Sequence, residues 1–136
     1  MDMDAVKRFF MEKDRFAAYL GIEVLDVTPG SARVRMPLTS EHKNGLAIGH
    51  GGAIFSLADL AFAVASNSHG SVAVAINADI SYVKAATGDM LFAEARETSR
   101  NPRLATYTVE VTDQSGDLVA IFQGMVYRKK ERMAFG

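Results

Sequence analysis

The chain has 136 residues, of which 49% are hydrophobic and 23% are charged, so its size and composition predict one folded domain over residues 1–136. Its 15 Lys and Arg residues against 16 Asp and Glu residues give a formal charge of -1, which argues against nucleic acid or an anionic membrane as a partner. The sequence contains no cysteine, which excludes disulfides, zinc–thiolate sites and a cysteine nucleophile.

Apolar residues at helical spacing predict an amphipathic helix over residues 4–19, which Gly21 would end. Two strands are expected next, at about residues 22–27 and 31–36, on either side of a turn that contains proline and glycine. Residues 38–50 are polar and predict a loop, which is long enough for us to expect a functional role.

A nearly apolar segment from Gly51 to about Ser66 predicts a second helix, buried on most sides. Asp59 is its only charged residue and shares a narrow stripe of small and polar side chains with Ser56 and Ala63. The segment is too short to cross a bilayer, and the N-terminal residues have no apolar stretch of the secretory kind. We therefore expect a cytoplasmic protein with no membrane partner.

Four strand-like stretches follow, at roughly residues 72–84, 89–98, 104–113 and 117–128. Short connections with turn residues favour an antiparallel meander. The tail, residues 129–136, is expected to be frayed. The predicted fold is α+β, with one antiparallel sheet wrapped around one long central helix. Because one helix covers only part of such a sheet, the uncovered apolar strand positions suggest an oligomer.

Asp59 and the segment His50-Gly51-Gly52 form the pattern that suggests chemistry. A carboxylate in an apolar helix is costly to bury, so Asp59 either faces solvent, an interface or a salt-bridge partner, or has a functional role. Free amide N–H groups at a helix start, with glycines that permit close approach, can stabilise a developing negative charge such as a thioester oxyanion. The alternative is an ordinary capped helix start whose glycines serve backbone geometry.

Eight residues separate Gly51 from Asp59, which is about 12 Å along a helix. Two groups so far apart on one helix cannot act on one carbonyl. If both are catalytic, Asp59 must come from a second subunit whose helix runs antiparallel alongside the first. The spacing then predicts a homodimer with composite active sites.

The segment from Asn44 through His50-Gly51-Gly52 to Asp59 resembles the hotdog-fold acyl-CoA thioesterases of the phenylacetate-degradation (PaaI-like) group. The similarity covers roughly residues 18–128 and includes the strand-like stretch Ile80–Lys84. It implies a hotdog fold and hydrolysis of an aromatic or short- to medium-chain acyl-CoA, such as a phenylacetyl-CoA or hydroxyphenylacetyl-CoA type substrate. It further implies no metal or prosthetic cofactor, and a tetramer built as a dimer of dimers.

The same resemblance implies a role for each residue of the motif. The Gly51 amide N–H would polarise the thioester carbonyl. Asp59 of the partner subunit would act as the nucleophile or as the general base for water. Asn44 and His50 would position the thioester, the water or the loop.

Lys84, Arg100 and Arg103 stand at strand ends or turns and are candidates for binding the phosphates of CoA, although solvated turn charges are the more ordinary explanation. The chain departs from the family pattern at these places. Lys84-Ala85-Ala86 stands where a basic residue followed by proline is frequent, and residues 100–103 stand where a Gly-basic pair is common.

We expect His42 to be an exposed loop residue and His69 to be a turn residue without a chemical role. The spacing of His42, His50 and Asp59 fits no zinc site. Two other functions remain open, a non-catalytic acyl-CoA-binding protein and a hydratase or dehydratase of the same fold. An intact Asp59 favours catalysis over binding alone, and a histidine at the helix start with the aspartate inside the helix suits the thioesterase better than the hydratase.

Overall fold

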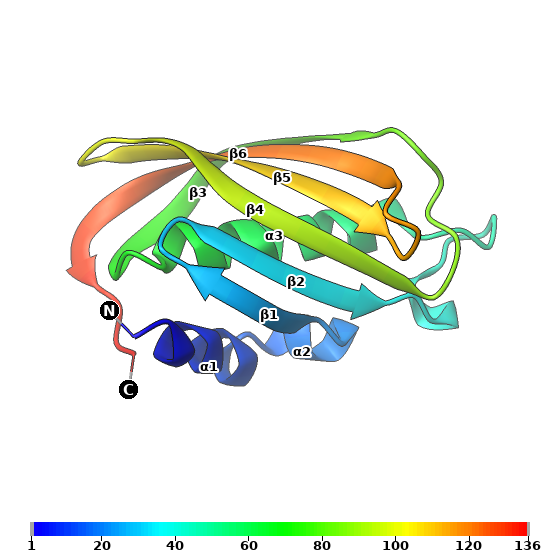
Figure 1. Cartoon of the computed structure of the whole chain (residues 1–136), viewed down its shortest axis with the longest axis horizontal. Helices are drawn as coiled ribbons and strands as arrows, with labels where there is room; N and C mark the ends of the chain where they lie inside the picture. Colours follow the sequence, from blue (N-terminus) through cyan, green and yellow to red (C-terminus); the bar gives the residue numbers. More distant parts are fainter. Residues whose placement is uncertain (1, 136) are drawn as a thin grey trace.

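Six antiparallel strands form one curved sheet around a long helix, α3, in the computed structural model, which describes residues 2–135 (Figure 1). The order of strands across the sheet is β1-β2-β4-β5-β6-β3. The predicted α+β fold, a sheet around one long central helix, is confirmed. In chain order the elements are α1 (Met3–Lys13), α2 (Arg15–Leu20), β1 (Glu23–Thr28), β2 (Ser31–Pro37), a short 3-10 helix η1 (Ser40–His42), α3 (Gly51–Asn67), β3 (Ser71–Tyr82), β4 (Met90–Arg100), β5 (Leu104–Asp113) and β6 (Leu118–Arg132).

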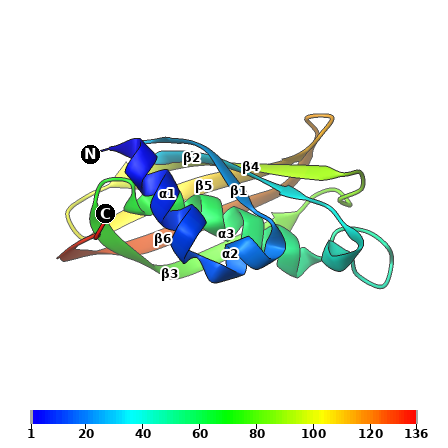
Figure 2. The same ribbon diagram turned by 90° about the horizontal axis from the view of Figure 1, so that it is seen from below.

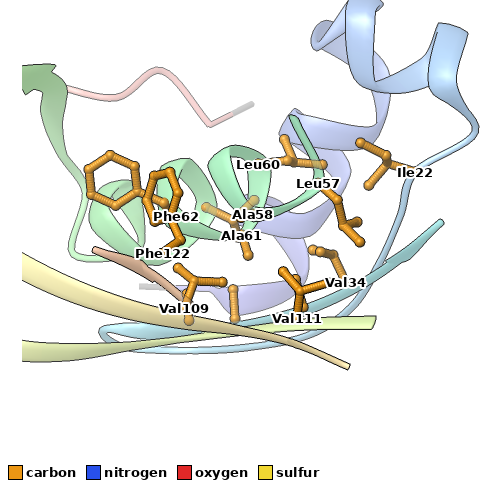
Figure 3. Packing of buried hydrophobic residues seen from close by; sticks show 14 of the residues in the cluster. Ile22, Val34, Leu57, Ala58, Leu60, Ala61, Phe62, Val109, Val111 and Phe122 are labelled. Carbon is orange, nitrogen blue, oxygen red and sulfur yellow. The ribbon is translucent and has the colours of Figure 1, made fainter. Parts of the chain in front are cut away.

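The hydrophobic core lies between α3 and the inner face of the sheet (Figure 3). Along β5, Tyr107, Val109 and Val111 are buried, whereas Thr108 and Glu110 between them are partly exposed, because successive side chains of a strand point to opposite faces. Phe62 of α3 packs against Phe122 of β6 with ring centroids 5.4 Å apart. The apolar face of the sheet thus packs against the apolar helix as one layer on another.

The N-terminal segment forms two helices, so the expectation of one helix over residues 4–19 was wrong. Asp14 ends α1 and begins α2: its backbone N–H donates to Phe10 O at 3.1 Å, and its side chain accepts from the Ala17 N–H at 3.0 Å. Aspartate is a preferred N-cap, and here the cap outweighs the helical periodicity that continues through it. Both helices contact α3, and Figure 2 shows them crossing the side of α3 that the sheet leaves uncovered.

Of the tail that we expected to be frayed, residues 129–132 continue β6 as far as Arg132, so the expectation was wrong for these residues; Gly136 lies outside the described residues. Ser71 of β3 pairs with Arg132, and the Met133 N–H donates to Gly70 O at 2.8 Å. β3 is long enough to supply a backbone partner for these residues. Among residues 2–135, no helix combines the length and the apolar character that crossing a bilayer requires.

Candidate active site

His50 is the N-cap of α3. Its Nδ1 accepts a hydrogen bond from the Gly52 N–H at 2.8 Å, and its own backbone N–H donates to His42 O at 2.7 Å. Because Nδ1 is an acceptor in this bond, the proton of the neutral ring is on Nε2. His50 therefore satisfies one of the unpaired N–H groups at the helix start and fixes the direction in which the helix begins.

The backbone of Gly51 is bonded on one side only. Its carbonyl accepts from the Tyr82 hydroxyl at 3.0 Å, whereas its N–H finds no acceptor within the described chain. A Cβ at Gly51 would lie 3.3 Å from the Tyr82 ring, so the close approach of Tyr82 favours glycine here. The result is an amide N–H at the positive end of a 17-residue helix, available to an anionic oxygen.

Asn44 shapes the loop that precedes α3. Its Oδ1 accepts from the Leu46 N–H at 2.9 Å and from the Ile48 N–H at 3.4 Å, and Ala47 between them has a left-handed φ of 62°. The folded loop forms one wall of a cavity of about 400 Å³ that contains Gly51. The residues lining this first cavity are Asn44, Ile48, Gly49, Gly51, Ile54, Tyr82, Val83, Lys84, Ala85 and Ala86.

Asp59 lies in a second cavity, of about 330 Å³, between α3, α2 and the start of β1. The lining is mostly apolar and consists of Asp14, Phe16, Ala17, Ile22, Phe55, Ser56, Asp59, Leu60 and Ala63. Asp59 is partly buried, and neither a hydrogen bond nor an ion pair engages its carboxylate within the described chain. A salt-bridge partner, one of the ordinary explanations for this residue, is therefore absent from residues 2–135.

The surroundings of Asp59 make its carboxylate easier to protonate. Burial raises the pKa of Asp59 above its ordinary value, and the negative charge of Asp14 raises it further. A carboxylate that is unpaired, partly desolvated and more basic than usual can accept a proton from water or attack an electrophilic carbon.

The two cavities share no lining residue. Gly51 is at the start of α3 and Asp59 is eight residues further, so the helix separates them by about 12 Å. One chain therefore holds a hydrogen-bond donor in one cavity and a carboxylate in another.

Of the three basic residues expected near CoA, one lies at the Gly51 end of α3 and two at the other. Lys84 lines the first cavity, but its Nζ is bonded to Asp113 at 2.8 Å and to Asp117 at 2.7 Å. Arg100 contacts His69, just beyond the C-terminal end of α3, with 2.6 Å between nitrogens, and the guanidinium of Arg103 donates to a backbone carbonyl of β6. Within one chain these three side chains form no common phosphate site.

His42 is buried, with only 6% of its surface exposed, so the expectation of an exposed loop residue was wrong. Its ring bonds to Leu20 O at 2.7 Å and to the Thr39 hydroxyl at 2.8 Å, and its backbone carbonyl receives the N–H of His50. It fastens the loop to the end of α2. Nothing in the sequence indicated this, because the Leu20 carbonyl is a backbone group 22 positions away.

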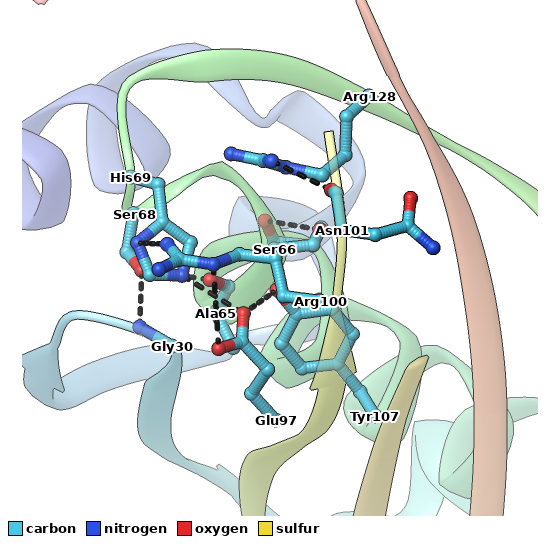
Figure 4. A network of polar contacts seen from close by, with 11 residues as sticks. Gly30, Ala65, Ser66, Ser68, His69, Glu97, Arg100, Asn101, Tyr107 and Arg128 are labelled. Carbon is cyan, nitrogen blue, oxygen red and sulfur yellow. Dashed lines mark hydrogen bonds and ion pairs between the residues drawn. The ribbon is translucent and has the colours of Figure 1, made fainter. Parts of the chain in front are cut away.

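His69 has a structural role at the C-terminal end of α3 (Figure 4). Its Nε2 lies 2.8 Å from the carboxylate of Glu97, which also accepts from the Tyr107 hydroxyl at 2.7 Å. Burial acts to raise the pKa of Glu97, but the hydrogen bonds from Tyr107 and His69 together outweigh it and hold the pKa below its usual value. This network pins the helix end to β4 and β5, away from both cavities.

Two residues that line these cavities were not predicted from the sequence. Tyr82 stands 31 positions from its partner Gly51 and comes next to it only through the fold. Asp14 falls inside the one helix expected from the sequence, and only the structure shows that it separates α1 from α2 and lines the cavity of Asp59. Within residues 2–135, no group of three or more His, Asp or Glu side chains is arranged to hold a metal ion.

Comparison with known proteins matches these features to one family. The family model of the thioesterase superfamily matches residues 47–120. Over 118 residues the chain is 38% identical to the acyl-coenzyme A thioesterase PaaI of Escherichia coli K12, covering 86% of this chain and 84% of that protein. It is 44% identical over 130 residues to a "Putative esterase" of Archaeoglobus fulgidus, covering 95% of this chain and 84% of that protein. The structure of the E. coli PaaI protein superposes with a TM-score of 0.93 at 34% identity, covering 97% of this chain and 96% of that one.

The fold and the motif at the start of α3 are those of a hotdog-fold thioester hydrolase, and the chain belongs to the thioesterase superfamily. Within that superfamily it is a member of the PaaI-like group. The family predicted from the segment between Asn44 and Asp59 is confirmed.

Proposed function

We propose that the protein hydrolyses an acyl-CoA thioester to free CoA and a carboxylic acid at sites that two copies of the chain complete together. The observation that carries the proposal is the pair of half-sites: a free N–H on Gly51 in one cavity and an unpaired carboxylate on Asp59 in another. The similarity to a protein named acyl-coenzyme A thioesterase supports the choice of substrate.

In the proposed reaction the thioester oxygen accepts the Gly51 N–H, whose position at the helix start favours the developing negative charge. His50 already occupies the Gly52 N–H, which leaves Gly51 as the available donor. The Asp59 carboxylate of the partner subunit takes a proton from water as the water oxygen bonds to the carbonyl carbon. The C–S bond then breaks, and the thiolate of CoA recovers that proton from Asp59.

Direct attack by Asp59 on the carbonyl carbon is the alternative course. It would release CoA thiolate and leave a mixed anhydride, which water then hydrolyses. Neither course uses a metal or a prosthetic cofactor.

The edge strand β3 supports an antiparallel dimer. β3 has 12 residues and pairs only with β6, and Val74 and Ile76 on it are 42% and 54% exposed. A long apolar edge strand is a template for pairing with another chain. Two β3 strands paired antiparallel would also place two α3 helices antiparallel, as the composite site requires. A tetramer of two such dimers is the assembly that we expect.

The same antiparallel arrangement would bring the three basic residues, Lys84, Arg100 and Arg103, close to one active site. The end of α3 near Arg100 and Arg103 would lie beside the Gly51 end of the partner subunit. Arg100 and Arg103 from one subunit, with Lys84 from the other, are therefore the candidates for the CoA phosphates.

The second cavity supports an aromatic or a short- to medium-chain acyl group. Phe16, Phe55 and Leu60 give it apolar walls, and a volume of about 330 Å³ suits a group of that size. A solved relative from Thermus thermophilus, 39% identical to this chain, is named a phenylacetic acid degradation protein. A phenylacetyl-CoA or hydroxyphenylacetyl-CoA type substrate, used in the cytoplasm in phenylacetate degradation, is the specific form of the proposal.

Replacing the carboxylate tests the proposed function. Asp59→Asn keeps the size of the side chain but removes the proton acceptor, so we expect thiol release from a panel of acyl-CoA substrates to fall about 100-fold or more. Asp26→Asn, at an exposed carboxylate of β1 that lines neither cavity and lies at the opposite edge of the sheet from β3, is the matched control and should leave the rate unchanged. Near-normal turnover by Asp59→Asn would contradict the mechanism. Acyl-CoA binding without hydrolysis by the wild-type chain, or hydration of an enoyl-CoA instead, would contradict the function.

A further inference from the structure

A second carboxylate lies in the cavity that contains Asp59. Asp14 and Asp59 are the two ionisable side chains among the nine residues that line it. Lys13 and Arg15, on either side of Asp14 in the sequence, are exposed and do not contribute to the lining. In the proposed dimer, the further titratable groups that would face this cavity are the partner subunit's His50, next to Gly51, and the partner subunit's Tyr82 and Lys84, which line the cavity that contains Gly51.

The break between α1 and α2 holds Asp14 in place. Its Oδ1 accepts from the Ala17 N–H at 3.0 Å, and its backbone N–H donates to Phe10 O at 3.1 Å. Asparagine and serine cap helices about as well as aspartate does. Capping alone therefore does not require the negative charge that Asp14 brings to the cavity.

We propose that Asp14 is a positioning residue for the hydrolysis and acts through Asp59, whose carboxylate becomes a stronger proton acceptor beside a second negative charge. The inference rests on the proposed function and adds a residue to the same site. Two carboxylates in a mostly apolar cavity repel each other, so the proton leaves Asp59 less readily. The direction of the pKa of Asp59, raised by burial and then by Asp14, agrees with this. A more basic carboxylate accelerates proton transfer as long as it is ionised at the working pH.

Asp14→Asn and Asp14→Ser test the charge because both keep the cap. In each variant the acid limb of the pH–rate profile should move to lower pH, and the plateau kcat should fall a few-fold with little change in KM. Asp2→Asn is the matched control, since Asp2 is the exposed N-cap of α1 and accepts the Asp4 N–H at 2.9 Å. It should leave the acid limb in place.

A direct titration separates this proposal from the proposed function. Carbon-13 NMR of the Asp59 carboxyl, assigned with Asp59→Asn, should show a lower titration midpoint in Asp14→Asn than in the wild-type protein. Equal midpoints, or an acid limb that does not move, would overturn the role of Asp14 even if the enzyme turns over normally. Absence of hydrolysis by the wild-type protein would instead overturn the proposed function, while the titration still reports the coupling.

Discussion

At the scale of single residues, the ionised carboxylate of Asp59 is expected to make the fold less stable. Its carboxylate is partly buried in an apolar cavity without a partner within the described chain, and its pKa is raised. The folded protein therefore holds the Asp59 proton more tightly than the unfolded chain does. Its contribution to stability is fully present below the ordinary pKa and is lost as the pH rises through the raised one. Such a carboxylate is what the proposed catalytic role of Asp59 requires.

Asp59→Asn should therefore raise the thermal stability at pH 7 while it removes activity. The amide has no charge to desolvate, so we expect Tm to rise by a few degrees at pH 7 and by progressively less as the pH falls toward the ordinary value of 3.8. Calorimetry of both proteins across this range is the measurement. A variant less stable than the wild-type protein at pH 7 would show that Asp59 has a structural partner.

Gly51 provides a test of the hydrogen-bond donor. Gly51→Pro removes the N–H at the first position of α3, where proline suits a helix and where His50 is already extended with ψ 134°. We expect kcat to fall about 100- to 1000-fold, as for the loss of one oxyanion donor. Gly51→Ala is the control for bulk, because it adds a Cβ beside Tyr82 but keeps the N–H. If proline and alanine lowered kcat equally, the loss would reflect crowding of Tyr82.

At the scale of elements, helices and strands that produce a hydrophobic periodicity were predicted from the sequence. Boundaries that depend on a capping bond or on a neighbouring strand were not. The apolar run from Gly51 predicted α3, and the alternation around Tyr107 predicted β5, because both patterns reflect burial on one core. The split between α1 and α2 depends on one capping bond at Asp14, and the extension of β6 to Arg132 depends on its neighbour β3. Neither the capping bond nor the strand pairing produces a periodic pattern in the sequence. The motif at the start of α3 was visible in the sequence, whereas Tyr82 joins it only through the fold.

The network at the end of α3 has its own pH dependence. Glu97 accepts from Tyr107 and His69, and its pKa is lowered, so its stabilising effect is present above the ordinary value of 4.5 and is lost as the pH falls through the lowered one. Glu97→Gln should cost about 1.5–3 kcal/mol of unfolding free energy at pH 7. The difference from the wild-type protein should shrink toward pH 3. Urea unfolding at both pH values measures it, and an unchanged difference would show that the carboxylate charge is not involved.

At the scale of the whole molecule, the spacing predicted two half-sites if Gly51 and Asp59 are both catalytic, and the structure keeps the two residues in separate cavities. A dimer is needed to bring Gly51 and Asp59 together, and the apolar residues of β3 are the main sign of such a dimer in the sequence. Three features converge on it: the exposed edge strand, the unpaired Asp59 carboxylate and the free N–H of Gly51. An antiparallel second copy would pair with the edge strand and would bring the carboxylate of one chain to the N–H of the other.

Mixed dimers of two inactive chains test this account most directly. Gly51→Pro and Asp59→Ala homodimers should each be nearly inactive. Purified heterodimers should regain about half of the wild-type activity per dimer, because one of their two sites combines an intact Gly51 with an intact Asp59. Confirmed heterodimers that remain as inactive as the two parents would contradict the shared site.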